Sequence, residues 1–449
     1  MNLERWQLGL TAALAATSLV SIFAAQALLA IATLVFGARL LTGRARLQRT
    51  PLDAPVLAYS VWTLLSASFS TDPLASHDSA KKLVLFAVVY LAMDSMASER
   101  GRERILDASL LGGIALAAGT LLQYSFLGFD TLDRRPHSFL GHYMTASGLA
   151  MGTMILATAR LAFRRATLAL PSRQDLLALG LLGAALAGVT LLRAADLFAV
   201  ESERLFVAAM AASAGLLALS RGRWPGPATG TLLAAVAVPV CAWALVVSRT
   251  RNAWLGALAG MALLAFLRAP KALWLVPVGV AALLALRPAT VVDRLTVTDA
   301  SSLDRYYMWQ AGVDMIRDKP VFGHGPGMVP RIYGSYRWPE APNPQAAHLH
   351  DNVLQIAAER GIPCLVWWLW FVAAAMGQAW REIRRGRREG VGWKGPDPYW
   401  VARAALAILT SIMVAGLFEY NFGDSEILMF ALLVAALPFT LARQRAVPA

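Results

Sequence analysis

The chain has 449 residues, of which 57% are hydrophobic and 15% are charged, and its formal net charge is +13. Soluble proteins carry roughly 25% charged residues, and a single soluble core could not hide so much apolar sequence. The composition therefore excludes a soluble enzyme. The basic residues punctuate apolar runs, so we attribute the charge to membrane topology rather than to nucleic-acid binding. Cys241 and Cys364 both lie in apolar runs and form neither a disulfide framework nor a metal pattern.

In chain order, about 14 apolar runs approach the roughly 20 residues that a bilayer span needs. The first, Trp6–Leu41, is long enough for a tight hairpin with its break near Thr17, Ser18 and Ser21, and it lacks a cleavage site for a signal peptide. The other runs are Ala54–Phe69, Leu83–Met96, Ile105–Leu127, Phe139–Leu161, Leu176–Leu192, Leu205–Leu219, Gly230–Val247, Trp254–Leu267, Leu273–Leu286, Val353–Ala379, Val401–Phe418 and Ile427–Leu441. Because short runs can be half-helices, we predict an all-α, polytopic integral membrane protein with about 12 to 14 transmembrane helices.

The connections between these runs alternate in charge. Arginine-rich connections, such as the one after Trp380 with five arginines, are assigned to the cytoplasm by the positive-inside rule. Both termini are then cytoplasmic. All six histidines fall on the opposite side, which is where a site would lie. They are His77, His137, His142, His324, His348 and His350.

One connection is much longer than the rest. It divides the chain into N-terminal transmembrane helices (1–286), an extracytoplasmic loop (287–351) and C-terminal transmembrane helices (352–449). Unstructured loops longer than about 15 residues are usually functional or disordered, and the aromatic content of this one argues against disorder. Ser302–Asp304 predicts the start of a short helix that runs to about Ile316 and carries Trp309, and we expect it to lie on the membrane surface.

The long loop then holds Pro320–Gly327, which contains His324, and ends at His348 and His350. The glycines predict a tight structural turn rather than a nucleotide-binding loop. Two histidines two residues apart would not bind zinc without a third ligand, so we expect no metal and favour a general base. The segment from Glu419 to Glu426 lies on the same side, where it either orients the histidine or an arginine or forms an ordinary polar turn.

Several arginines lie on this side against the positive-inside rule. Arginine presents a planar fork of donors that suits phosphate, so their convergence predicts a phosphorylated or pyrophosphorylated headgroup as ligand. Snorkelling, or pairing with acidic residues such as Asp196 and Glu419, is the structural alternative. The candidates for headgroup binding are Arg193, Arg249, Arg251, Arg294 and Arg305.

These segments together resemble the O-antigen ligase and O-antigen polymerase superfamily of bacterial inner-membrane glycosyltransferases. The matching motifs are Thr250-Arg251-x-Ala-Trp254, Arg305-x-x-x-Trp309, Pro320-x-x-Gly-x-Gly325 and His350-x-x-x-Leu354-x-x-x-Ala-Glu359-x-Gly361. In the family an Asn follows the histidine directly, whereas here Asp351 stands there and Asn352 follows. His348 and His350 are therefore both candidates for the base, and alignment on Leu354 favours His350.

The resemblance implies a reaction at the periplasmic face of the inner membrane. The donor would be a glycan on undecaprenyl pyrophosphate and the acceptor a hydroxyl of lipid A–core, with no metal, nucleotide or other cofactor and no nucleic-acid partner. We expect His350 to act as base and Arg251 and Arg305 to stabilise the leaving pyrophosphate, with inversion at the anomeric carbon. Substrate contacts are expected from Arg193, Arg249, Arg294, His324, His348, Trp309 and Asn352. The alternatives are a polymerase, a protein O-oligosaccharyltransferase and, in a different class, a transporter of lipid-linked glycans.

Overall fold

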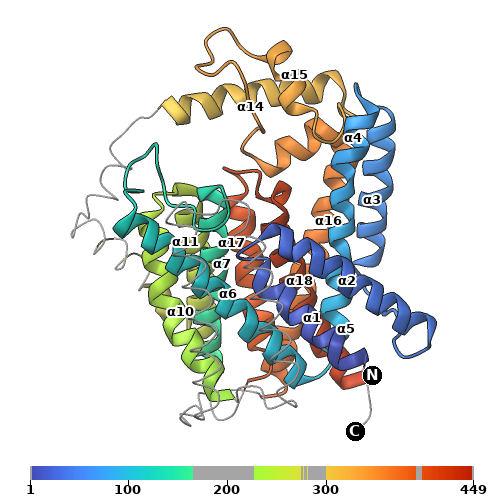
Figure 1. The fold of residues 1–449 in the computed structure, drawn as a ribbon, viewed down its shortest axis with the longest axis vertical. Coiled ribbons are helices and arrows are strands. Elements are labelled where there is room, and N and C mark those ends of the chain that lie inside the picture. Colours follow the sequence, from blue (N-terminus) through green and yellow to red (C-terminus); the bar gives the residue numbers. More distant parts are fainter. Residues whose placement is uncertain are drawn as a thin grey trace.

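The computed structural model describes residues 3–164, 227–274, 300–390 and 397–446, and every regular element within them is an α-helix or a 3-10 helix. The predicted all-α class is thus confirmed (Figure 1). The α-helices are α1 (Leu3–Thr17), α2 (Ile22–Leu41), α3 (Asp53–Ser68), α4 (Pro73–Ala80), α5 (Ala87–Ser95), α6 (Glu99–Phe126), α7 (Tyr143–Phe163), α10 (Pro227–Val247), α11 (Arg251–Arg268), α14 (Ala300–Asp318), α15 (Val329–Tyr336), α16 (Asn352–Arg388), α17 (Trp400–Ala415) and α18 (Ser425–Ala446). The 3-10 helices are η1 (Lys81–Phe86), η2 (Pro270–Trp274) and η3 (Asn421–Gly423).

Six of the described helices are long and apolar enough to cross a membrane, which confirms a polytopic membrane protein. They are α2, α6, α7, α10, α16 and α18. The predicted spans 176–192 and 205–219, and most of 273–286, lie outside the described residues. The total of about 12 to 14 spans therefore stays a prediction.

The N-terminal hairpin forms where the sequence predicts it. Helix α1 ends at Thr17 and α2 begins at Ile22. The hydroxyl of Ser21 accepts a hydrogen bond from the backbone N–H of Ala24 and so caps α2. Short hydroxyl side chains can satisfy the free N–H groups of a helix start, which is why the break falls among these residues.

The bundle carries a buried ion-pair group at the start of α6 and the end of α7. Arg160, which is 1% exposed, lies 2.6 Å from Asp107 and 2.7 Å from Glu103. Arg164 also pairs with Glu103. The chain connections at this end of α6 and α7 are among the arginine-rich ones that the sequence assigns to the cytoplasm, and carboxylates partly neutralise the arginines there.

At the opposite end, α14 and α15 lie above the bundle and form what we call the cap, residues 300–349 (Figure 1). A small hydrophobic cluster, separate from the main core, joins the cap to α16. Its buried members are Met308, Ala311, Met315, Val329, Tyr333, Ala346, Leu349 and Ala358. Helix α14 starts at Ala300, close to the predicted start at Ser302–Asp304, and ends at Asp318. Whether it lies on a membrane surface stays a prediction.

Helix α16 is kinked at Gly361, whose φ of 81° and ψ of 166° are not helical. The kink leaves carbonyls without helical partners, and the turn of the cap supplies donors to them. His324 N–H donates to the Ala358 carbonyl at 3.0 Å, and Gly325 N–H donates to the Glu359 carbonyl at 2.7 Å. A Cβ on Gly361 would lie 1.9 Å from the Val321 oxygen, so only glycine permits this close approach.

Candidate functional site

His350 lies directly before α16 and has a positive φ of 52°. Non-glycine residues seldom adopt this conformation, and such residues are concentrated at functional sites. Three non-glycine residues of the described chain share it, namely Ser138, Arg249 and His350. The side chain of the next residue, Asp351, accepts a hydrogen bond from the Leu354 N–H at 2.8 Å and caps α16. This cap fixes the start of the helix and holds His350 outside it.

The imidazole of His350 is paired with Glu419 from the loop between α17 and α18. The Nδ1 of His350 lies 2.8 Å from a carboxylate oxygen of Glu419, whose side chain is 4% exposed. Burial raises the pKa of Glu419, but the hydrogen bond from His350 and the charges of His350, His348 and Arg305 outweigh it and lower the pKa below its ordinary value. An ionised Glu419 can only accept a hydrogen bond, so it favours the tautomer of His350 with the proton on Nδ1, in which Nε2 has the free lone pair.

His348 contacts the other oxygen of the same carboxylate. Its Nε2 lies 3.4 Å from Glu419, and its ring centroid is 4.2 Å from that of His350. Burial lowers the pKa of His348 to about 4, although Glu419 opposes this shift. His348 is therefore a neutral ring at pH 7, whose Nε2–H can donate to Glu419.

A fourth titratable group, His142 at the start of α7, interacts electrostatically with Glu419 and His350. Burial lowers the pKa of His142, the nearby Glu419 carboxylate opposes the shift, and His350 and Arg135 add to it. The guanidinium of Arg135 lies 3.9 Å from the ring centroid of Tyr143, the residue after His142. The signal in the sequence was only that His142 shares the extracytoplasmic side with His350.

One of the predicted arginines, Arg251, contacts the first turn of α14, and another, Arg305, lies on that helix. The Nη2 of Arg251 donates to the Ser302 hydroxyl at 3.2 Å. Arg305 follows Ser302 by three residues and so shares its helix face, and its charge acts on both His348 and Glu419. The Nε of Arg305 is buried and has no hydrogen-bond partner among the described residues. Arg249 lies in the turn before α11 with a φ of 52°, while Arg193 and Arg294 lie outside the described residues.

Of the remaining predicted residues, Trp309 lies near Arg305, whereas His324 and Asn352 are buried in the protein. Trp309 lies one turn beyond Arg305, and its ring is 6.2 Å from Phe418, the residue before Glu419. His324 is 3% exposed and its Nε2 lies 3.2 Å from the Met315 carbonyl, so it packs inside the cap. Asn352 is also buried, with its amide bonded to Asn421 at 2.7 Å and to the Phe422 N–H at 3.0 Å. It ties the start of α16 to the loop that carries Glu419.

His348, His350 and Glu419 also have the spacing of a metal site. One ligand atom from each lies within 4.8 Å of the others. Two imidazoles and a carboxylate are a donor set that zinc accepts. The sequence offers no third ligand beside the two histidines, whereas the fold brings the carboxylate of Glu419, 69 residues from His350, to a position where it could serve as one. The same contacts equally suit a hydrogen-bonded base, so the geometry fits both uses.

A comparison with protein families matches one part of the chain. A family model described as O-antigen ligase matches residues 233–369, which confirms the resemblance to O-antigen ligases and polymerases. The matched segment runs from α10 into α16 and contains Arg251, Arg305 and His350, whereas Glu419 and His142 lie outside it. No curated protein matches the chain.

Proposed function

Residues 233–369 match the O-antigen ligase family of membrane glycosyltransferases, and we propose that this protein is an O-antigen ligase. It moves O-antigen polysaccharide from undecaprenyl pyrophosphate to lipid A–core at the periplasmic face of the inner membrane. The cap and the segment before it, residues 287–351, form its catalytic loop. The observation that carries the proposal is the 2.8 Å contact between His350 Nδ1 and the buried carboxylate of Glu419.

That contact suits the chemistry of the transfer. A sugar hydroxyl is a weak nucleophile until a base takes its proton. As the acceptor oxygen bonds to the anomeric carbon, its proton passes to Nε2 of His350, and Glu419 stabilises the imidazolium that forms. The bond from the anomeric carbon to the pyrophosphate breaks on the opposite face, so the configuration inverts.

The arginines act on the leaving group. Undecaprenyl pyrophosphate gains negative charge as it departs, and fixed cationic donors in a partly dehydrated site stabilise such charge strongly. Arg251 bonds to Ser302, three residues before Arg305, and the buried Nε of Arg305 is a donor that no described residue occupies. We assign the pyrophosphate to these two side chains, with Arg249, Arg193 and Arg294 as further contacts. Trp309 would stack on a sugar, and Asn352 and His324 support the site from within the protein.

The test uses purified protein with lipid-linked glycan and lipid A–core, in chelator and without nucleotide. We expect glycan-bearing lipid A to form, because the base and the arginines need no metal. His350→Asn should lower the rate at least a hundredfold. Asparagine tolerates positive φ, so the loss would report the missing base rather than backbone strain.

The matched control is His77→Ala, which removes an exposed histidine on α4, at the same end of the molecule as the cap. It should transfer at the wild-type rate. Normal transfer by His350→Asn would refute the base. Loss of activity in chelator that zinc restores would favour the metal use of the His348, His350 and Glu419 cluster. Longer glycans on the donor, without lipid A product, would indicate a polymerase, and neither product would favour a transporter.

A further inference from the structure

We propose that Glu359 is a positioning residue of this transfer reaction, which holds in place both chain segments that carry the base and its carboxylate partner. The inference rests on the proposed function but concerns a side chain that touches neither substrate nor His350. Glu359 lies on α16 immediately before the kink and is 2% exposed. Its two carboxylate oxygens lead to two different segments of the site.

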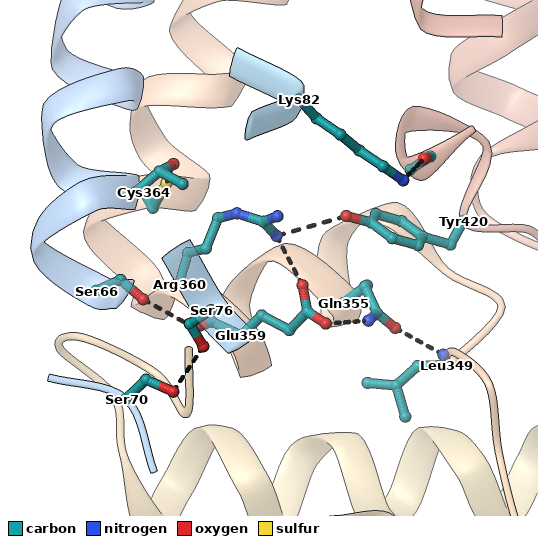
Figure 2. Close-up of polar contacts among 12 residues, drawn as sticks. Ser66, Ser70, Ser76, Lys82, Leu349, Gln355, Glu359, Arg360, Cys364 and Tyr420 are labelled. Atoms are coloured by element: carbon teal, nitrogen blue, oxygen red, sulfur yellow. Dashed lines mark hydrogen bonds and ion pairs between the residues drawn. The ribbon is translucent and has the colours of Figure 1, made fainter. Parts of the chain in front are cut away.

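The first oxygen leads to His350. The side-chain amide of Gln355 donates to Oε1 of Glu359 at 2.8 Å, and the oxygen of the same amide accepts from the backbone N–H of Leu349 at 2.7 Å. Only the oxygen of Gln355 can accept from that N–H, so its NH₂ group must face Glu359. Leu349 is the residue before His350, and its N–H is thus tied to the rigid interior of α16 (Figure 2).

The second oxygen leads to Glu419. Arg360 Nη1 donates to Oε2 of Glu359 at 2.8 Å and to the hydroxyl oxygen of Tyr420 at 3.4 Å. Tyr420 is the residue after Glu419, so this arm reaches the segment that holds the carboxylate partner of the base (Figure 2). The two arms end beside the two members of the His350–Glu419 pair.

The backbone of Glu359 is itself fixed from outside α16. Its carbonyl accepts from the Ser66 hydroxyl at 3.0 Å and from the Gly325 N–H at 2.7 Å. Trp62 Nε1 donates to the next carbonyl, that of Arg360, at 3.1 Å. The side chain of Glu359 therefore starts from a point that α3 and the cap both hold, which suits a residue that must set positions to fractions of an ångström.

A contribution to stability is a weak explanation for the buried ion pair of Glu359 and Arg360. A buried ion pair costs desolvation, and apolar residues of similar volume are often at least as stabilising. A fully bonded buried network does, however, specify one arrangement of the chains that it joins. Here the network joins two segments of the chain, residues 349–350 and 419–420. A small displacement of a catalytic group can cost up to about a hundredfold in rate.

The test compares Glu359→Gln with a matched control in the full-length protein. The new amide would present its NH₂ group to one of two donors, so one arm must break. We expect kcat to fall about tenfold to a hundredfold, while KM for the lipid-linked donor changes less than about twofold. The control is Glu382→Gln, a buried glutamate on the same helix that accepts from Gln378 four residues earlier at 3.0 Å. Its kcat should stay at the wild-type value.

A double variant separates positioning from a general structural role. If Glu359 acts through the His350–Glu419 pair, Glu359→Gln should cost almost nothing further in a Glu419→Gln background. The proposal would be overturned if the two losses of kcat multiplied in the double variant, or if kcat were unchanged in Glu359→Gln. Should Glu359→Gln not fold, Gln355→Met and Tyr420→Phe each break one arm and should each lower kcat.

Hydrogen exchange gives a readout that does not need activity. In Glu359→Gln the peptides that cover residues 345–352 and 417–424 should exchange faster than in wild type, whereas Glu382→Gln should leave both unchanged. Unchanged exchange in both peptides would refute the positioning role even if the wild type transferred no glycan. Absent transfer by the wild type, with faster exchange in the variant, would refute the proposed function alone.

Discussion

The backbone of His350 adopts a conformation that costs of order 1 kcal/mol or more for a non-glycine residue. Three contacts hold His350 in this conformation. Asp351 caps the following helix, the preceding N–H is bonded to Gln355, and Glu419 holds the ring. The strain places Nδ1 against a carboxylate, so that the opposite ring nitrogen becomes the basic one. The sequence and its resemblance could name His350 as the candidate base, but its carboxylate partner lies 69 residues away and is joined to it only by the fold.

The half-buried His348 predicts how stability depends on pH. Its folded-state pKa of about 4 lies below its usual 6.5, so the unfolded chain binds more protons between these values. The free energy of unfolding should therefore fall as the pH falls from about 6.5 to about 4. Thermal unfolding in detergent measures this, and His348→Gln should weaken the dependence. An equal slope in wild type and variant would contradict the burial of a neutral ring. Glu419 adds a loss only at lower pH, because its pKa is depressed.

At the scale of elements, the sequence predicts helices well where the signals are local. The hydroxyl-rich break at Ser21 and the start of α14 near Ser302 both appear close to the expected residues. The role of Gly361 is not local. Its sequence signal, a glycine two residues before Pro363, is compatible with an ordinary kink. What fixes it is a turn some 40 residues earlier, whose N–H groups fill the carbonyls that the kink leaves free.

The contact between the cap turn and the kink of α16 predicts that alanine substitutions at two glycines of this helix change stability differently. Gly361→Ala would add a Cβ 1.9 Å from the Val321 oxygen at a φ of 81°, so it should lower the free energy of unfolding by at least about 1–3 kcal/mol. Gly377→Ala, where nothing lies within 4 Å, should leave stability unchanged or raise it by at most about 1 kcal/mol. Thermal unfolding and limited proteolysis of the cap report both. Equal stability of the two variants would refute a cap that depends on the kink.

For the whole molecule, the arginine pattern predicts an orientation in the membrane, which stays a prediction. The start of α1 and the end of α18 lie at the end of the bundle opposite the cap (Figure 1). The histidines and Glu419 are gathered towards the cap, while the Arg160 ion pairs lie at the start of α6. Neighbours such as His142 could be assigned to this side from sequence, but their convergence could not, because it depends on packing between helices far apart in the chain.

Cysteine labelling in intact cells tests the orientation. Both native cysteines, Cys241 and Cys364, are buried and should give little background. On the proposed orientation the cap faces the periplasm, so Ser335→Cys on the exposed part of α15 should react with a maleimide that cannot cross the inner membrane. Arg384→Cys, exposed near the end of α16, should react only after the cells are opened. Labelling of Arg384→Cys in intact cells would invert the topology.

The attachment of the cap has an evolutionary consequence. The bonds from His324 and Gly325 to α16 join main-chain atoms, and so does the bond from the Ile362 N–H to the Pro320 carbonyl. Most side-chain substitutions leave such main-chain bonds intact, provided that the glycines remain. The outward surface of α14 and α15 can therefore diverge as the glycan or the acceptor changes between lineages, while the histidine keeps its place. We expect grafts of a foreign cap that retain the glycine turn to exchange substrate preference without rebuilding the bundle.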